Sequence, residues 1–203
     1  MQKKPITVAE LIVINNADPE WVARKQRDEL IGTERIAKFR AEQAPLMKEL
    51  AGIGIHYESL GAMLNSGGPY KSAIPVLLTH LRKPYSIPTR ESIARCLAVP
   101  DARYAWSELA DLYRGEPVAL QGSKGAKDGL AVALAATTTD ATIDELIDIA
   151  KDKSHGSSRL LLLRALRRSK QPSAKQAIEE LASDPELAKE IASWRRRRAC
   201  VLG

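Results

Sequence analysis

The stretch Ala73-Ile74-Pro75-Val76-Leu77-Leu78-Thr79-His80-Leu81 decides the fold, because its apolar spacing returns further along the chain. Ala73, Ile74, Leu77, Leu78 and Leu81 follow the three- and four-residue spacing of one helix face. The corresponding residues in the later copies are Ala105, Trp106, Leu109, Ala110 and Tyr113, then Thr142, Ile143, Leu146, Ile147 and Ala150, and more weakly Ala177, Ile178, Leu181 and Ala182. A helix therefore recurs at a period of about 35 residues, which is typical of helical repeats.

A second helix is predicted between each pair of these copies, because a second set of apolar positions also corresponds. Its members are Ile93, Ala94, Cys96 and Leu97, then Leu130, Ala131, Ala133 and Leu134, then Leu162, Leu163, Ala165 and Leu166. Each unit is thus expected to be a helical hairpin. One hairpin cannot cover its own apolar face, so about four of them are expected to stack into an all-α, right-handed α-solenoid.

The first unit carries a family resemblance. Residues 73–78, followed by Thr89-Arg90-Glu91-Ser92-Ile93-Ala94-Arg95-Cys96-Leu97, resemble a HEAT repeat of the short bacterial kind also called PBS-lyase HEAT-like. The resemblance covers about residues 69–194, and the sequence as a whole is similar to small bacterial HEAT-repeat proteins. Two later copies depart from the pattern at the position of Pro75, where they carry Ser107 and Asp144. The resemblance implies binding of other macromolecules through an extended surface.

The N-terminal third is predicted to form a helical cap. Thr7-Val8-Ala9-Glu10 has the spacing of a capping box and indicates a helix over 7–15. Asp18-Pro19-Glu20 then begins a long charged helix over about 19–44, which Pro45 is expected to kink or restart. Two short helices are expected at 45–51 and 56–65. The glycine-rich break at 65–69 sets a boundary between a cap of residues 1–68 and a repeat array of residues 69–203.

Composition and spacing exclude several classes of protein. With 44% hydrophobic residues in 203, the chain should fold, and no apolar run reaches the length of a membrane span or a signal-peptide core. Only two cysteines are present, Cys96 and Cys200, which favours the cytoplasm.

The three histidines lie far apart, and residues 122–127 have the composition but not the spacing of a phosphate-binding loop. No cofactor, no metal and no catalytic residue is therefore expected, and the protein is predicted not to be an enzyme.

The net charge of +6 is confined to residues 154–203, because acidic and basic residues balance in the rest of the chain. Arg164, Arg167 and Arg168 are spaced to share one face of a helix, and four further arginines follow Trp194. This concentration indicates an anionic partner, unless the nearby glutamates at 179, 180, 186 and 190 neutralise the arginines. The last four residues, Cys200-Val201-Leu202-Gly203, fit a prenylation pattern, although an ordinary exposed tail is the favoured interpretation.

The function that we expect is non-catalytic binding of a protein partner with an acidic surface. The residues expected to make contact, because each lies near a second helix, are Arg90, Arg95, Lys127, Arg159 and Arg164. Nucleic-acid binding is the alternative, through Arg164, Arg167, Arg168, Arg195, Arg196, Arg197 and Arg198. A DNA glycosylase of HEAT-like architecture is a further possibility, in which Trp106 and Asp111 would hold a damaged nucleotide with Arg103 or Arg114 nearby.

Overall fold

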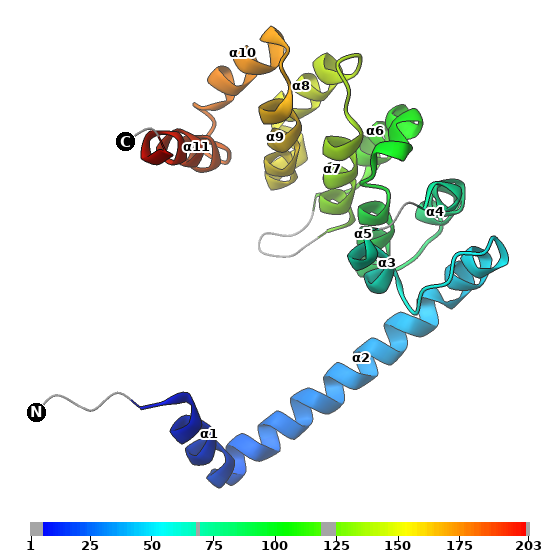
Figure 1. Ribbon diagram of the computed structural model, residues 1–203, viewed down its shortest axis with the longest axis vertical. Coiled ribbons are helices and arrows are strands. Elements are labelled where there is room, and N and C mark those ends of the chain that lie inside the picture. The colour runs from blue at the N-terminus through cyan, green and yellow to red at the C-terminus, as the bar shows by residue number, and fades with distance from the viewer. Residues whose placement is uncertain (1–5, 68–69, 119–124, 202–203) are drawn as a thin grey trace, which may run out of the picture. The chain divides into compact units, whose positions relative to one another are not determined.

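The computed structural model describes residues 6–67, 70–118 and 125–201, with the side chains of 195–201 excepted (Figure 1). The α-helices in these ranges are α1 Val8–Ala17, α2 Pro19–Gly52, α3 Leu60–Ser66, α4 Ile74–Leu81, α5 Ile87–Cys96, α6 Trp106–Gly115, α7 Ala126–Thr137, α8 Ile143–Lys151, α9 Arg159–Arg168, α10 Pro172–Leu181 and α11 Ala188–Val201. Short 3-10 helices precede α4, α6 and α9, at Lys71–Ala73, Pro100–Ala105 and Lys153–Ser158. The described residues contain no strand, so the predicted all-α class is confirmed.

The chain divides into two compact units, Met1–Glu42 and Gln43–Gly203. The division falls within α2, whereas the sequence placed the boundary after residue 68. In the first unit, α1 begins at the predicted capping box, since Thr7 Oγ1 accepts a bond from the Glu10 amide and Glu10 Oε2 accepts one from the Thr7 amide. None of the residues of α1 is buried. No helix in the described ranges is both long and apolar enough to cross a lipid bilayer.

The separate helix expected at 45–51 is wrong, since α2 continues through Pro45 to Gly52. Proline removes one backbone hydrogen bond from a helix interior, which is a local cost. Packing around the proline offsets it, because Gln43, Leu46 and Leu50 are all buried, and Gln43 Oε1 accepts a bond from the Leu60 amide at 3.0 Å. The expected helix at 56–65 begins only at Leu60, because Ser59 caps it, and it ends before Gly67, which adopts the left-handed conformation at φ 59°.

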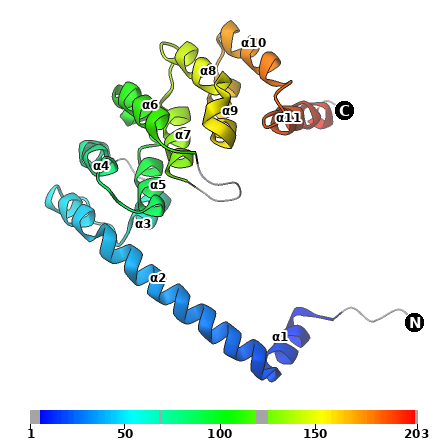
Figure 2. The same ribbon diagram turned by 180° about the vertical axis from the view of Figure 1, so that it is seen from behind.

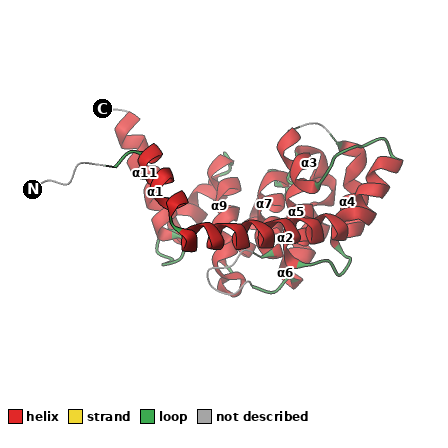
Figure 3. Cartoon of the chain, turned by 90° about the horizontal axis from the view of Figure 1, so that it is seen from below, coloured by secondary structure: helices red, strands yellow, loops and turns green. Residues whose placement is uncertain are grey.

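The second unit contains helices at the four places where the repeat predicted helical hairpins. Its central row is formed by the later helix of each pair, since α5 packs against α7 and α7 packs against α9. The earlier helices flank this row, with α4 on α5, α6 on α7 and α8 on α9, while α10 contacts both α8 and α9. Figures 1 and 2 show this succession from opposite sides, and Figure 3 shows only helices and loops in the described part of the chain.

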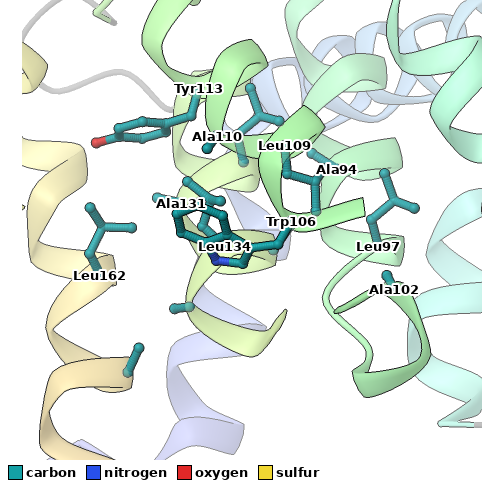
Figure 4. Packing of buried hydrophobic residues seen from close by; sticks show 14 of the residues in the cluster. Ala94, Leu97, Ala102, Trp106, Leu109, Ala110, Tyr113, Ala131, Leu134 and Leu162 are labelled. Atoms are coloured by element: carbon teal, nitrogen blue, oxygen red, sulfur yellow. The ribbon is translucent and has the colours of Figure 1, made fainter. Parts of the chain in front are cut away.

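One cluster of buried apolar residues runs through the second unit. Figure 4 shows its middle, where Trp106 of α6 lies beside Ala131 and Leu134 of α7. The Trp106 indole is buried and its Nε1–H donates to Thr138 Oγ1 at 2.9 Å, so this aromatic residue is a packing residue with a satisfied polar end. The predicted core positions of the first copy are likewise buried, from Ala73 to Leu81.

The contact between α5 and α7 depends on a glycine. A Cβ atom placed on Gly129 of α7 would lie 2.5 Å from the carbonyl oxygen of Glu91 and 3.1 Å from the Cβ of Ala94, both on α5. The two helix backbones therefore approach more closely than a side chain at 129 permits. Small residues on the second helices, which the sequence showed as alanines, set the spacing of the central row.

Candidate binding groove

The three arginines of α9 lie together on the surface, as their spacing predicted. Leu162, Leu163 and Leu166 are buried, which turns the opposite side of α9 towards solvent. Arg164, Arg167 and Arg168 are all exposed, and all three line a single pocket of about 680 Å³. We refer to this pocket as the α7–α9–α11 groove, after the helices that supply most of its lining.

The α7–α9–α11 groove has an apolar floor and a basic rim. Its remaining lining residues are Ala98, Pro100, Val132, Ala135, Ala136, Leu160, Leu161, Glu190 and Trp194. Small side chains from the end of the α5 region and from α7 thus line the groove together with the three arginines of α9. Such a surface can accept an apolar side chain and a neighbouring carboxylate at the same time.

The three arginines differ in how firmly they are held. The Arg168 guanidinium donates to the carbonyl oxygen of Ala135 at 2.9 Å, which ties α9 to α7. The Arg167 guanidinium lies over the Trp194 ring, 5.0 Å from its centroid, and the indole Nε1–H donates to Glu190 Oε1 at 2.7 Å. Arg164 has no ion pair or hydrogen bond with any residue in the described ranges. None of the described side chains therefore neutralises its charge.

Three of the four glutamates near these arginines, Glu180, Glu186 and Glu190, already bind other residues. Glu186 binds Arg159, with Oε2 to Nη2 at 2.7 Å, and Glu180 binds Lys151 at 2.6 Å, which lowers the pKa of Glu180. Glu190 accepts the bond from Trp194 described above. Among the described side chains, no ion pair joins a glutamate to Arg164, Arg167 or Arg168, so the basic rim is not neutralised by its neighbours.

Lys127 and Arg159 must be removed from the predicted partner-binding set, because both are buried. Lys127 Nζ donates to the carbonyl oxygens of Tyr113 and Glu116, at 2.8 and 2.6 Å, and desolvation lowers its pKa. The Arg159 guanidinium binds Asp184 at 2.9 Å as well as Glu186. Lys127 thus joins the two helices of one hairpin, α6 and α7, and Arg159 joins α9 to the segment between α10 and α11.

Arg90 and Arg95 are partly exposed but already paired. Arg90 Nη1 binds Glu116 Oε1 at 2.8 Å, and Arg95 binds Glu91 one turn earlier on α5 at 2.9 Å. Arg90 lines a different hollow, with Arg82, Glu108 and Asp111, so it is not brought together with Arg164. The side chains of Arg195, Arg196, Arg197 and Arg198 lie outside the described residues, as does that of Cys200, and the predictions for them stay predictions.

Two groups that could serve acid–base chemistry, Tyr113 and His155, are buried next to each other. The Tyr113 hydroxyl is 2.7 Å from Ser158 Oγ, and burial raises the pKa of Tyr113 to about 12. Beside it, His155 packs edge-on against the Tyr113 ring, and desolvation lowers the pKa of His155. In the described ranges no group of three His, Cys, Asp or Glu side chains is arranged to hold a metal ion.

Comparison of the chain with protein-family models, with curated proteins and with solved structures gives no match. The case for a binding site therefore rests on the geometry of the α7–α9–α11 groove. Sequence reasoning found its arginines but missed Trp194 and the alanine floor. Ala98, Val132, Ala135 and Ala136 lie outside the apolar sets predicted for the second helices, so no role was predicted for them.

Proposed function

We propose that this protein is a non-catalytic binding module, an α-solenoid of HEAT-like hairpins that holds an acidic segment of another protein in the α7–α9–α11 groove. The order of the helix contacts and the repeated apolar positions support the solenoid. One observation carries the binding function. The exposed Arg164, which has no charged partner among the described side chains, lines a pocket of about 680 Å³ together with apolar residues.

The floor favours a protein segment over a nucleic acid as ligand. Alanine, valine and leucine side chains offer contacts to apolar groups, which a peptide carries in its side chains and a sugar–phosphate backbone lacks. Arginine at the rim supplies paired N–H donors that match a carboxylate. The preferred ligand is thus an amphipathic helical segment that carries leucine together with glutamate or aspartate.

The experiment is a fluorescence anisotropy titration with a labelled amphipathic peptide of leucine and glutamate at helical spacing. A second peptide, in which lysine replaces each glutamate, controls for the sign of the charge. Arg164→Glu is expected to weaken binding of the acidic peptide by about tenfold or more, because it replaces attraction with repulsion. Arg103→Glu is the matched control, since Arg103 is exposed on the 3-10 helix before α6 and outside the groove.

Nucleic-acid binding is the second candidate, supported by the three arginines on one face and by the stacking of Arg167 on Trp194. The same titration with labelled single- and double-stranded DNA and RNA separates the two functions. Nucleic-acid affinity that persists near physiological salt, falls steeply as salt rises and is lost in Arg164→Glu would replace the first proposal by the second. Binding of neither probe would reject both.

A further inference from the structure

Helix α1 exposes its large apolar side chains to solvent. A group of such side chains in contact with water marks an interaction surface. The group consists of residues that are between 49% and 75% exposed, namely Ile6, Val8, Leu11, Ile12, Val13 and Ile14. The rest of the described chain leaves them uncovered, so the surface that covers them belongs to a second molecule.

The segment that carries these side chains is also acidic. Residues 6–23 contain Glu10, Asp18 and Glu20 and no lysine or arginine. Glu10 and Ile14 are four residues apart, so the carboxylate and the isoleucine lie on the same face of α1. The capping box uses Oε2 of Glu10, which leaves Oε1 able to accept a bond from another molecule. The segment therefore combines apolar side chains with carboxylates, as a ligand of the α7–α9–α11 groove should.

The exposed side of α9 has the complementary arrangement. Leu160 is 38% exposed and lines the groove, as does Arg164 four residues later. When α1 lies along α9 in the opposite direction, Ile14 meets Leu160 and Glu10 meets Arg164. The same direction would instead set the isoleucine against the arginine and the carboxylate against the leucine. The equal spacing on the two helices thus fits the antiparallel orientation.

We propose that α1 of one copy occupies the α7–α9–α11 groove of a second copy, antiparallel to α9. The proposal rests on the proposed function of the groove and names the N-terminal helix of the chain itself as an occupant. The two copies use different surfaces, so a bound pair still has one empty groove and one uncovered α1. Assembly is therefore open-ended and grows with protein concentration.

Sedimentation velocity of the full chain from about 1 µM to about 500 µM tests the assembly. Wild type is expected to form dimers and then longer assemblies as the concentration rises. Ile14→Asp and Arg164→Glu are each expected to raise the dissociation constant by about tenfold or more, since one removes the apolar contact and the other sets carboxylate against carboxylate. Ile87→Asp is the matched control and is expected to leave it within about twofold. Ile87 and Ile14 are both 55% exposed, and Ile87 lies on α5 outside the groove.

A mixture of the two interface variants tests whether the contact joins different surfaces. Ile14→Asp retains the groove and Arg164→Glu retains α1. Together they are expected to form a dimer with the affinity of wild type, and this dimer cannot grow because its remaining surfaces are both defective. A mixture in which no such dimer forms overturns the proposal.

The acidic peptide described above separates failure of this proposal from failure of the proposed function. It is titrated into Ile14→Asp, whose groove is expected to be empty. A wild type that stays monomeric at every concentration overturns the proposal for α1, while binding of the peptide leaves the proposed function standing. Loss of peptide binding as well overturns both. A monomeric wild type that floats with phosphatidylglycerol vesicles, when Ile14→Asp does not, would assign α1 to a lipid surface instead.

Discussion

Arg159 has more bonds than any other buried side chain of α9. Its guanidinium donates to the carbonyl oxygens of Ala150 and Gly156 and to the carboxylates of Asp184 and Glu186. The arginine is 1% exposed, and the Asp184 side chain is 7% exposed. A buried charge pair of this kind is costly to break, because removal of one partner leaves the other charged and desolvated.

Arg159→Ala is therefore expected to lower the free energy of unfolding by about 3–5 kcal/mol, the range found for a broken buried ion pair. Arg164→Ala, on the same helix but exposed, is expected to change it by less than about 0.5 kcal/mol. Urea denaturation followed by circular dichroism measures both. Equal stabilities of the two variants would contradict the structural role of Arg159.

The pair also makes stability depend on pH. The Arg159 guanidinium, which binds Asp184 Oδ2, lowers the pKa of Asp184 below its ordinary value. A lowered pKa in the folded state means that the unfolded chain binds more protons as the pH falls below about 5, so the stabilisation is present above that range and is lost in acid. Between pH 7 and pH 3, the free energy of unfolding of Asp184→Asn is expected to fall less than that of wild type. Parallel pH profiles in urea titrations would contradict this.

Single residues also show where prediction from sequence stops. The spacing of Arg164, Arg167 and Arg168 was sufficient to place them on one face. The burial of Lys127 and Arg159 was not predictable, because their acceptors lie on other elements. Lys127 meets carbonyl groups of Tyr113 and Glu116, and Arg159 meets a carboxylate 25 residues further along the chain. No local pattern distinguishes such a cation from one that faces water.

At the scale of helices, the central row of α5, α7 and α9 depends on close backbone approach. Gly129 gives the sharpest case, since its Cβ position is already occupied by the Glu91 carbonyl oxygen. In an exposed helix interior, replacement of glycine by alanine is stabilising by about 1 kcal/mol. Here the added methyl group must push α5 and α7 apart.

Gly129→Ala is accordingly expected to destabilise the protein by about 1–3 kcal/mol, the cost of overpacking a core. Gly61→Ala serves as control, because a Cβ at Gly61 of α3 would meet only Ser59 Oγ, at the ordinary distance of 3.7 Å. That variant should be at least as stable as wild type. Thermal melts of the two proteins make the comparison, and a stabilised Gly129→Ala would show that the helices can move apart at no cost.

Helix boundaries were predictable where a local signal sets them. The capping box at Thr7 and Glu10 starts α1 as expected, and Gly67 ends α3 within the predicted break. The separate helix predicted after Pro45 was wrong because the tendency of proline to interrupt a helix describes a helix without tertiary packing. The outcome at Pro45 was decided by the burial of Leu46 and Leu50, which the N-terminal sequence alone could not reveal.

At the scale of the whole molecule, the two units differ in how much apolar surface they bury. The second unit has a continuous core, whereas α1 has no buried residue and exposes Val8, Ile12 and Val13. Helices without tertiary packing are only marginally stable in water. Sequence periodicity predicted the well-packed part correctly because each copy repeats the same core positions. It offered no comparable signal for what covers the first unit.

Hydrogen exchange should report this difference directly. Amides of residues 8–40 are expected to exchange faster than those of α7 by at least about a hundredfold, because local opening there costs little free energy. Mass spectrometry of peptic fragments measures both segments in one sample. Equal protection of the two segments would mean that the first unit is stabilised by packing of its own.

The bond between Arg159 and Asp184 has a consequence for synthesis of the chain. The ribosome adds Arg159 to the chain 25 residues before Asp184, the residue that neutralises its charge. Until Asp184 is added, burial of the Arg159 guanidinium would leave a charge without its partner. The hairpin of α8 and α9 can close fully only after residue 184 has left the exit tunnel. A truncated chain that ends between Arg159 and Asp184 never acquires this counter-ion, and we expect cellular proteases to degrade it.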